Sequence, residues 1–309
     1  MLQYIKFKDY KHAKLLINLW NVEFRRRFHI DKNTYKEKIL EDKNLNKEAS
    51  FVALYDNEPV GFIFIKNRLN ESGFEAESDT AFISLIYVSE EMRHMGIGSD
   101  LLKLAISEIK KHHNIKLLKV GNEINNLFPG LPNEFTDAPI FFMNKDFRQT
   151  EGVVDMIRII RFTGLEEYED NVHVFIATED DKEKLLRFCL DNNFTKEGYL
   201  LSQYFEAEGT GKDLIVARKD GIIHGIAKIK ADFKKEFFVK ENKQGFVEFF
   251  IHDDKLSNEQ IVTFAKQTKN YLIKRGCKQI VVQAIKDIKF FKELGYSAYK
   301  YYLEFELDI

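Results

Sequence analysis

The alternation of apolar and polar residues along the chain predicts the same series of secondary-structure elements twice. Each half begins with a short strand, at residues 4–7 and 173–177, and continues with apolar residues at helical spacing. Two strands joined by a tight turn follow, then a mainly apolar strand, at 82–88 and 246–251, a long amphipathic helix and a further strand. We therefore predict an α/β protein (α+β in some classifications) with two domains of like topology.

The two halves also resemble each other residue by residue. The segment 51–61 parallels 215–225, from an apolar strand through a turn to a glycine. Farther along, 82–88 parallels 246–252 at the same offset, although the stretch between the matched segments varies. Because the offset survives that variable stretch, we interpret the halves as two copies of one unit.

The boundary between the copies is predicted within residues 163–171. Gly164 and several acidic residues interrupt the apolar pattern there. The chain length of 309 residues also suits two domains, since a common domain has roughly 150 residues. We predict a first domain at residues 1–165 and a second at residues 170–309.

The charge balance argues against a protein that binds nucleic acid mainly through its phosphates. The chain has 47 Lys and Arg against 49 Asp and Glu, and both signs are spread along it. Hydrophobic residues make up 44% of the sequence, with 28 Phe and 13 Tyr, so the composition is that of a globular protein rather than a disordered one. No nucleic-acid partner is expected.

Neither cysteine nor histidine spacing indicates a metal site. Cys189 and Cys277 are too few for a disulfide framework and too far apart for a ligand pair, and the eight histidines show no ligand spacing.

The N-terminus lacks the apolar core of a signal peptide, and no stretch reaches the ~18 apolar residues of a membrane helix. We expect a cytoplasmic protein without metal or membrane association.

The most informative segment is the glycine-containing loop at residues 93–99, between an apolar strand ending near Val88 and an amphipathic helix. Glycine lets the backbone approach a ligand closely, and the unpaired N–H groups of a helix start attract anions such as phosphate. The dinucleotide-binding fingerprint fails, because its third glycine position is Leu101, and no Gly-Lys-Ser/Thr follows. Taken alone, the loop is equally compatible with an ordinary tight turn.

In its context the loop resembles the signature of GNAT-type N-acetyltransferases, which is Arg or Gln, two variable residues, Gly, one variable residue, then Gly or Ala. Arg93, Gly96 and Gly98 match this pattern. The resemblance implies two GNAT-like domains, each a mixed, mostly antiparallel sheet flanked by helices. It also implies that the loop N–H groups hold the pyrophosphate of coenzyme A, while the preceding strand binds the pantetheine arm. The residues so implied are Ile86, Tyr87, Val88, Arg93, His94, Met95, Gly96, Ile97, Gly98 and Ser99.

A second block of the family, an aromatic pair followed by a Gly-aromatic step, is similar to residues 141–147, although Asp146 replaces the usual glycine. The second copy keeps the block at 290–296. Its phosphate-loop position, 253–260, contains no glycine and adds acidic charge that would repel a pyrophosphate. We therefore predict a degenerate second copy that does not hold coenzyme A in this way.

Catalytic residues are harder to identify. Acyl transfer from a thioester needs a neutral amine, yet the strand before the loop carries no acid. Ser84 can orient a water, Glu23 or His29 can act as a base through water, and Tyr87 can protonate the leaving thiolate if it faces the cleft; a structural role is the alternative for each. The usual tyrosine acid would fall at Phe142, which has no proton to donate. A strand N–H can stabilise the oxyanion.

Two further segments are candidates for recognising the acceptor. Residues 20–29 combine aromatic, acidic and basic side chains near the presumed cleft, and an amphipathic helix with a solvated face is the alternative. The loop 121–137 exists only in the first copy, so it is either a substrate lid or a tolerated insertion. No Gly-x-Ser-x-Gly occurs, which argues against a serine nucleophile.

The resemblance thus implies transfer of the acetyl group from acetyl-CoA to a primary amine of a small molecule or peptide, by direct attack on the thioester. Three alternatives stay open: an acyltransferase with a longer acyl donor, a non-catalytic coenzyme A sensor, and an enzyme that modifies proteins. The sequence does not predict the oligomeric state.

Overall fold

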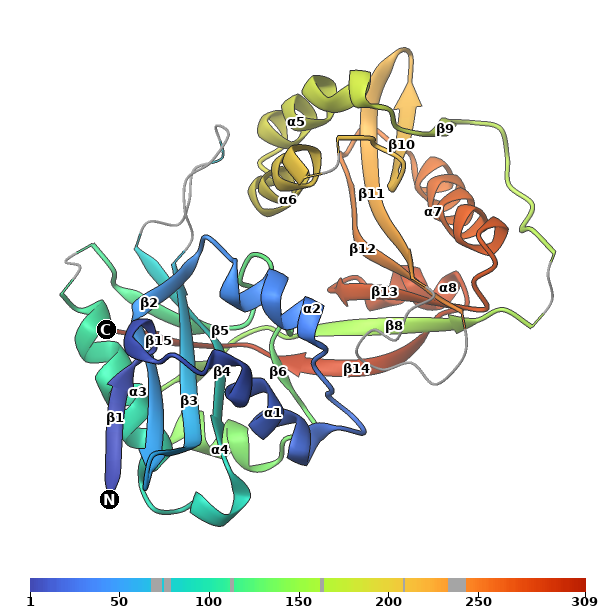
Figure 1. The fold of residues 1–309 in the computed structure, drawn as a ribbon. Coiled ribbons are helices and arrows are strands. Elements are labelled where there is room, and N and C mark those ends of the chain that lie inside the picture. The colour runs from blue at the N-terminus through green and yellow to red at the C-terminus, as the bar shows by residue number, and fades with distance from the viewer. Residues whose placement is uncertain (68–73, 75–78, 112–113, 162–163, 208, 233–242) are drawn as a thin grey trace.

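Two mixed sheets, one in each lobe, organise the chain (Figure 1). The computed structural model describes all of residues 1–309 except 68–73, 75–78, 112–113, 162–163, 208 and 233–242. The predicted α/β architecture with two similar units is confirmed: in both sheets the first strands form an antiparallel meander, and one parallel pair follows.

The first sheet has seven strands in the order β1-β2-β3-β4-β5-β15-β7, with β4 and β5 parallel. Along Phe51 to Leu54 the side chains alternate between the two faces. Val52 and Leu54 pack on the α1 side, and Phe51 and Ala53 pack on the α3 side. The strands are β1 Leu2–Lys6, β2 Leu45–Tyr55, β3 Glu58–Asn67, β4 Thr80–Val88, β5 Leu117–Val120, β7 Arg148–Gln149 and β15 Phe305–Asp308.

Helices cover both faces of this sheet. Leu16 and Trp20 of α1 fill one core cluster, whereas Leu101 and Ala105 of α3 fill the other. The helices are α1 Ala13–Phe24, α2 Lys32–Tyr35, α3 Ile97–Ile109 and α4 Asp137–Met143, with a π-helical turn η2 Lys36–Leu40 and 3-10 turns η1 Phe7–Asp9 and η3 Glu90–Met92.

The second sheet has eight strands in the order β6-β14-β8-β13-β12-β11-β10-β9. Helices α5 and α6 pack on one face and α7 on the other, as the two core clusters of this lobe show. Its strands are β6 Leu131–Pro132, β8 Val153–Ile159, β9 His173–Ile176, β10 Leu214–Lys219, β11 Ile222–Asp232, β12 Gln244–His252, β13 Gln279–Ile285 and β14 Ser297–Leu303. Its helices are η4 Glu179–Asp181, α5 Lys182–Asp191, α6 Thr195–Ala207, α7 Asn258–Lys274 and α8 Ile288–Glu293.

The two lobes exchange strands. β8 precedes the predicted boundary but pairs with β13 and β14 in the second sheet. β15 follows β14 directly and crosses back to lie between β5 and β7 of the first sheet. The ranges 1–165 and 170–309 remain a prediction, and neither range contains every strand of its own sheet. Thr163, at the start of the predicted boundary, lies outside the described residues.

Phe74, in the connection between β3 and β4, is buried in the second lobe. It is 3% exposed and belongs to the core cluster of Leu185 and Leu201. Gly198 of α6 makes room for its ring, because a Cβ built at that position would lie only 2.0 Å from Phe74 Cε1. One side chain from the first lobe therefore completes the core of the second.

Lys300 of β14 is buried where the lobes meet, with its ammonium 4.9 Å from the ring centroid of Phe28. Burial lowers the pKa of Lys300 to about 7, although the charges of Glu134 and Asp155 oppose this shift. Burial likewise raises the pKa of Asp155 to about 6, while its carboxylate accepts a hydrogen bond from the Tyr302 hydroxyl at 3.0 Å.

We expect the contribution of Lys300 to the free energy of unfolding to rise with pH between about 7, its pKa in the folded protein, and ~10.4, its pKa in the unfolded chain. In the unfolded chain Lys300 holds its proton up to a pKa of ~10.4, whereas the folded protein releases it near 7, so the unfolded chain binds more protons in this interval. Urea unfolding across this interval should show a slope that Lys300→Met reduces by up to ~1.4 kcal/mol per pH unit. Equal slopes in both proteins would contradict the burial of this ammonium.

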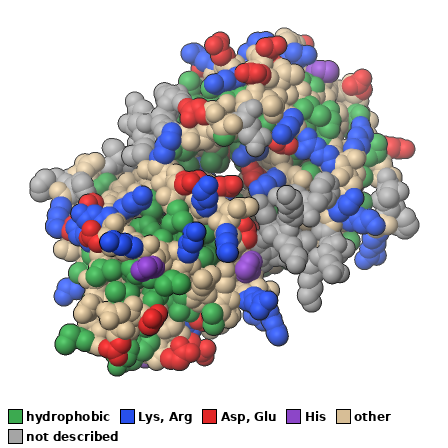
Figure 2. Space-filling model, in the orientation of Figure 1, with side chains coloured by type: hydrophobic (Ala, Val, Ile, Leu, Met, Phe, Trp, Pro, Cys, Tyr) green, Lys and Arg blue, Asp and Glu red, His purple; other side chains and the backbone are tan. Residues whose placement is uncertain are grey.

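The surface carries charges of both signs. On the face shown in Figure 2, Lys and Arg alternate with Asp and Glu over both lobes, without one large patch of a single sign. Within the part of the chain that the structure describes, no helix is long and apolar enough to cross a membrane.

Candidate functional site

A cleft opens where the parallel strands β4 and β5 separate. They pair from Thr80 to Ile83, but β4 continues to Val88 while β5 ends at Val120. Ser84 is a bulge at the fork, since Ile83 and Leu85 lie opposite consecutive residues of β3. A bulge bends its strand and increases the local twist, which favours the separation. The β4 edge beyond Ile83 therefore faces an opening instead of a neighbouring strand.

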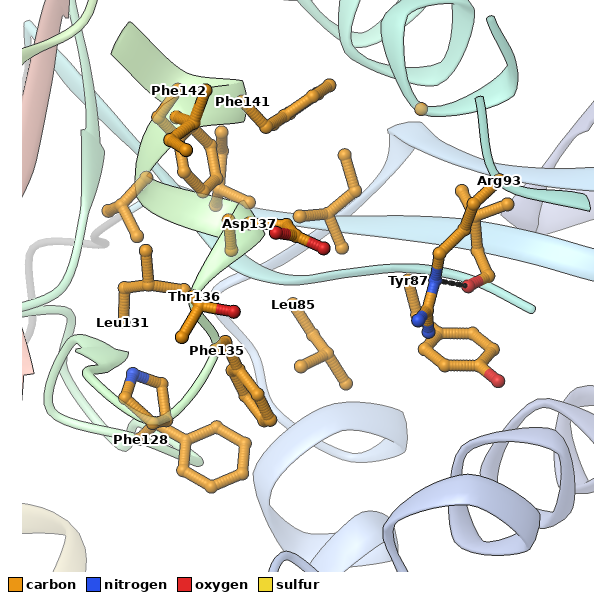
Figure 3. Close-up of a pocket in the computed structure, with 18 of the residues that line it drawn as sticks. Leu85, Tyr87, Arg93, Phe128, Leu131, Phe135, Thr136, Asp137, Phe141 and Phe142 are labelled. Carbon is orange, nitrogen blue, oxygen red and sulfur yellow. Dashed lines mark hydrogen bonds between the residues drawn. The ribbon is translucent and has the colours of Figure 1, made fainter. Parts of the chain in front are cut away.

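This opening is a cavity of about 780 Å³. Its walls come from α1, β4, the loop that starts α3, the segment 128–138 and α4 (Figure 3). The predicted residues that line it are Glu23, Ser84, Ile86, Tyr87, Val88, Arg93, His94, Gly96, Ile97, Gly98 and Ser99. Met95 is 62% exposed, and neither it nor His29 is among the lining residues.

The start of α3 forms one wall of the cavity. Gly96 precedes the helix with φ +84°, a left-handed conformation that favours glycine, and no side chain caps this end. A Cβ at Gly98 would lie 3.4 Å from the Phe141 ring, so the glycine loop and the aromatic block contact each other. The first N–H groups of α3 are thus left available to an anion.

The corresponding helix of the second lobe begins differently. Ser257 caps α7 by accepting a hydrogen bond from the Gln260 N–H, and the Gln260 side chain accepts one from the Ser257 N–H. Shortly before α7, Asp253 is buried, and its Oδ2 lies 2.8 Å from Nδ1 of His224. The chain's own side chains therefore occupy the positions that an anion would use.

Arg93, Glu23 and Tyr87 form a polar group on the cavity wall. The Arg93 guanidinium donates to both Glu23 oxygens at 2.6 Å, and the Tyr87 hydroxyl donates to Glu23 at 2.9 Å. Burial and the Glu23 charge raise the pKa of Tyr87, so its hydroxyl keeps its proton. Burial disfavours the charged form of Arg93, but its hydrogen bonds to Glu23 raise its pKa overall. Since both Glu23 oxygens are engaged, we interpret Glu23 as the residue that positions Arg93 and Tyr87.

The wall formed by α1 and the segment 128–138 is aromatic. Trp20 lies 4.4 Å from Phe24 between ring centroids, and Phe24 lies 5.0 Å from Phe135. Glu134 and Asp137 also line the cavity, and Figure 3 shows the Asp137 carboxylate pointing into it. These side chains suit a ligand with an apolar body and a positive charge.

The second lobe supports this part of the wall. Leu131 and Pro132 of β6 line the cavity and pair with Leu303 and Tyr302 of β14. The loop 121–137 is therefore anchored at this point to the second sheet rather than free to swing. That this loop acts as a substrate lid, rather than being a tolerated insertion, stays a prediction.

Sequence reasoning missed Glu123. This residue accepts a hydrogen bond from the Ser84 hydroxyl at 2.7 Å, and it belongs to the loop that exists only in the first copy. The sequence indicates only a turn after β5, through Gly121 and Asn122, which both have positive φ; it does not indicate which side chain the turn brings to Ser84. Among the described residues, no group of three or more His, Cys, Asp or Glu side chains is arranged to hold a metal ion.

Part of the chain matches a known protein family. Residues 13–127 match the model of the acetyltransferase (GNAT) family. No curated protein sequence matches the chain significantly.

Solved structures match the fold along the whole chain. A GCN5-related glucosamine N-acetyltransferase region of a fungal multi-domain GH3 β-N-acetylglucosaminidase has a TM-score of 0.80 at 16% identity; the match covers 99% of this chain and 38% of that one. A GCN5-related N-acetyltransferase from Sphaerobacter thermophilus has a TM-score of 0.70 at 11% identity, covering 100% and 95%. A tandem GNAT protein from the clavulanic acid biosynthesis pathway has a TM-score of 0.64 at 11% identity, covering 100% and 98%.

Proposed function

We propose that the chain is an acyltransferase of the tandem GNAT type, and that its first lobe transfers the acetyl group of acetyl-CoA to a primary amine. The acceptor is a small molecule or a peptide, and its amine attacks the thioester directly. The observation that carries this proposal is the uncapped start of α3 beside the fork between β4 and β5. It joins an anion site to an open strand edge within one cavity.

The residues present fit coenzyme A. The α3 start offers free N–H groups and the positive end of the helix dipole to a pyrophosphate. Nothing lies within 4 Å of a Cβ built at Gly96, so there is room for the phosphates to approach the backbone. Residues 86–88 would hold the pantetheine arm between the α3 start and the fork. Bound acetyl-CoA supplies the electrophilic carbonyl carbon.

The chain's own groups then serve the transfer. A backbone N–H of β4 at the fork stabilises the oxyanion of the tetrahedral intermediate. The thiolate departs readily because its thiol has a pKa of only ~8.5, and the Tyr87 hydroxyl, which keeps its proton, can turn from Glu23 to donate a hydrogen bond to it. The aromatic walls around Trp20 hold the acceptor, while Glu134 and Asp137 attract its positive charge.

Three other readings make different predictions. A longer acyl donor changes the mass of the product, and a coenzyme A sensor binds the ligand without turnover. A protein-modifying enzyme acetylates a lysine of a partner. The aromatic and acidic lining of the cavity favours a compact amine over a lysine of a partner protein as the acceptor. A cytoplasmic location stays a prediction.

Titration calorimetry with acetyl-CoA tests the donor site. We expect one site per chain, because α3 is uncapped whereas Ser257 caps α7. A hundredfold excess of ligand over its dissociation constant should also raise the free energy of unfolding by ~2.7 kcal/mol. Mass spectrometry of a panel of amines then identifies the product; the panel includes glucosamine, because the similar fungal region is a glucosamine N-acetyltransferase. Two sites would contradict a degenerate second copy, and absence of binding would contradict the proposed function.

A further inference from the structure

A buried polar cluster lies directly behind Ser84, and the reaction described above does not use it. Ser84 lines the cavity, and its hydroxyl donates to Glu123 Oε1 at 2.7 Å. The Lys66 ammonium lies 3.3 Å from the same oxygen and 2.9 Å from Oδ2 of Asp42. The residue exposure is 2% for Glu123 and 0% for Lys66. Ser84 is thus the link between this cluster and the cavity.

The cluster holds two carboxylates around one ammonium, and the two are not equally satisfied. Asp42 accepts hydrogen bonds from the backbone and side chain of Asn44 at 2.8 and 2.9 Å and from the Asn125 amide at 3.1 Å, besides contacting Lys66. Oε2 of Glu123 is buried and accepts no hydrogen bond from the described residues. Glu123 is therefore the carboxylate with spare acceptor capacity.

The charged and polar groups that face Glu123 shift its pKa in opposite directions. Burial raises the pKa of Glu123, and the Asp42 charge adds to this effect, whereas Lys66 and the Ser84 hydrogen bond oppose it. Lys38 of η2 faces the same cluster, and burial lowers its pKa. A carboxylate with a raised pKa is a better proton acceptor than an ordinary surface glutamate.

We propose that Glu123 receives the proton of the acceptor ammonium through the Ser84 hydroxyl. This inference rests on the proposed function and supplies the base that the β4 strand lacks. An N–H bond of the ammonium breaks and its proton goes to Ser84 Oγ, while the Ser84 hydroxyl proton passes to Glu123. The neutral amine then bonds to the thioester carbon, the C–S bond breaks, and the second amine proton leaves with the thiolate. Glu123 returns its proton to solvent before the next cycle.

The fold explains why the first copy alone has this relay. Gly121 and Asn122, at φ +94° and +58°, turn the chain back after β5, which brings Glu123 under the bulge at Ser84. The loop that carries Glu123 has no counterpart in the second copy. The relay therefore accompanies the uncapped helix start and not the capped one.

Glu123→Gln tests the relay with little change in shape, because the glutamine oxygen can still accept from Ser84 and Lys66. We expect kcat to fall about 100-fold with unchanged acetyl-CoA affinity by calorimetry. In the wild type kcat should fall as the pH drops through the pKa of Glu123, and the variant should lack this limb. Ser84→Ala should behave alike, and Ser84→Thr, which keeps the hydroxyl, should restore activity. An unchanged kcat and pH profile in Glu123→Gln would overturn the proposal.

Ser50→Ala is the matched control, since Ser50 is a buried serine of the same sheet that donates to the Asn46 carbonyl and does not line the cavity. We expect it to lower stability but to leave kcat and its pH profile unchanged. If no amine is acetylated, the proposed function fails, and carboxyl NMR of ¹³C-labelled glutamate still decides the relay. The resonance lost in Glu123→Gln should titrate above the ordinary glutamate range and higher still in Ser84→Ala. Titration in the ordinary range would overturn the relay.

Discussion

Gly96→Asp is expected to weaken acetyl-CoA binding at least 100-fold. The substitution places a carboxylate beside the free N–H groups of α3, where it competes with the pyrophosphate for them and repels it. The left-handed φ of +84° adds a backbone strain of ~1–3 kcal/mol for any residue with a Cβ. Calorimetric titration measures the affinity, and thermal unfolding measures the strain.

Gly221→Asp separates these two effects. Gly221 lies in the turn between β10 and β11 with φ +81°, and, as at Gly96, nothing lies within 4 Å of a Cβ built there. Both variants should therefore carry a similar strain, whereas only Gly96→Asp should lose affinity. Equal affinity for acetyl-CoA in the two variants would show that the α3 start is not the anion site.

Phe74→Ala is expected to lower the free energy of unfolding by ~3–5 kcal/mol. The ring of Phe74 fills a space in the core of the second lobe although its backbone belongs to the first lobe. Its removal therefore leaves a cavity and also weakens the attachment of the lobes to each other. Urea unfolding monitored by circular dichroism and by Trp20, the single tryptophan, which lies in the first lobe, measures both effects.

Gly198→Ala provides a sharper test of the same contact. Alanine normally stabilises a helix relative to glycine by ~1 kcal/mol. Here its methyl group would meet the Phe74 ring at 2.0 Å, so the single variant should be less stable than the wild type. In the Phe74→Ala background the clash disappears, and the same substitution should stabilise the protein. A stabilising effect in both backgrounds would contradict the position of the ring.

The site itself was only partly predictable. Arg93, Gly96 and Gly98 lie close together in the sequence, and the need for a close backbone approach at a helix start is a local property. Their placement in one cavity with Tyr87 and Ser84 follows from the strand-loop-helix order. Glu123 could not be identified in this way, because its partners lie on β4 and β3, and the hydrogen bond that joins it to Ser84 depends on the tertiary structure.

The sequence alone determined the two copies, the order of their elements and the difference between their helix starts. Apolar periodicity, turn residues such as Asp220 and the presence or absence of glycine before a helix all act within a few residues. The tertiary structure decided the exchange of β8 and β15, the insertion of Phe74 beside Gly198 and the charge cluster behind Ser84. Each of these joins segments far apart in the chain, and such contacts depend on which surfaces meet after the elements have formed.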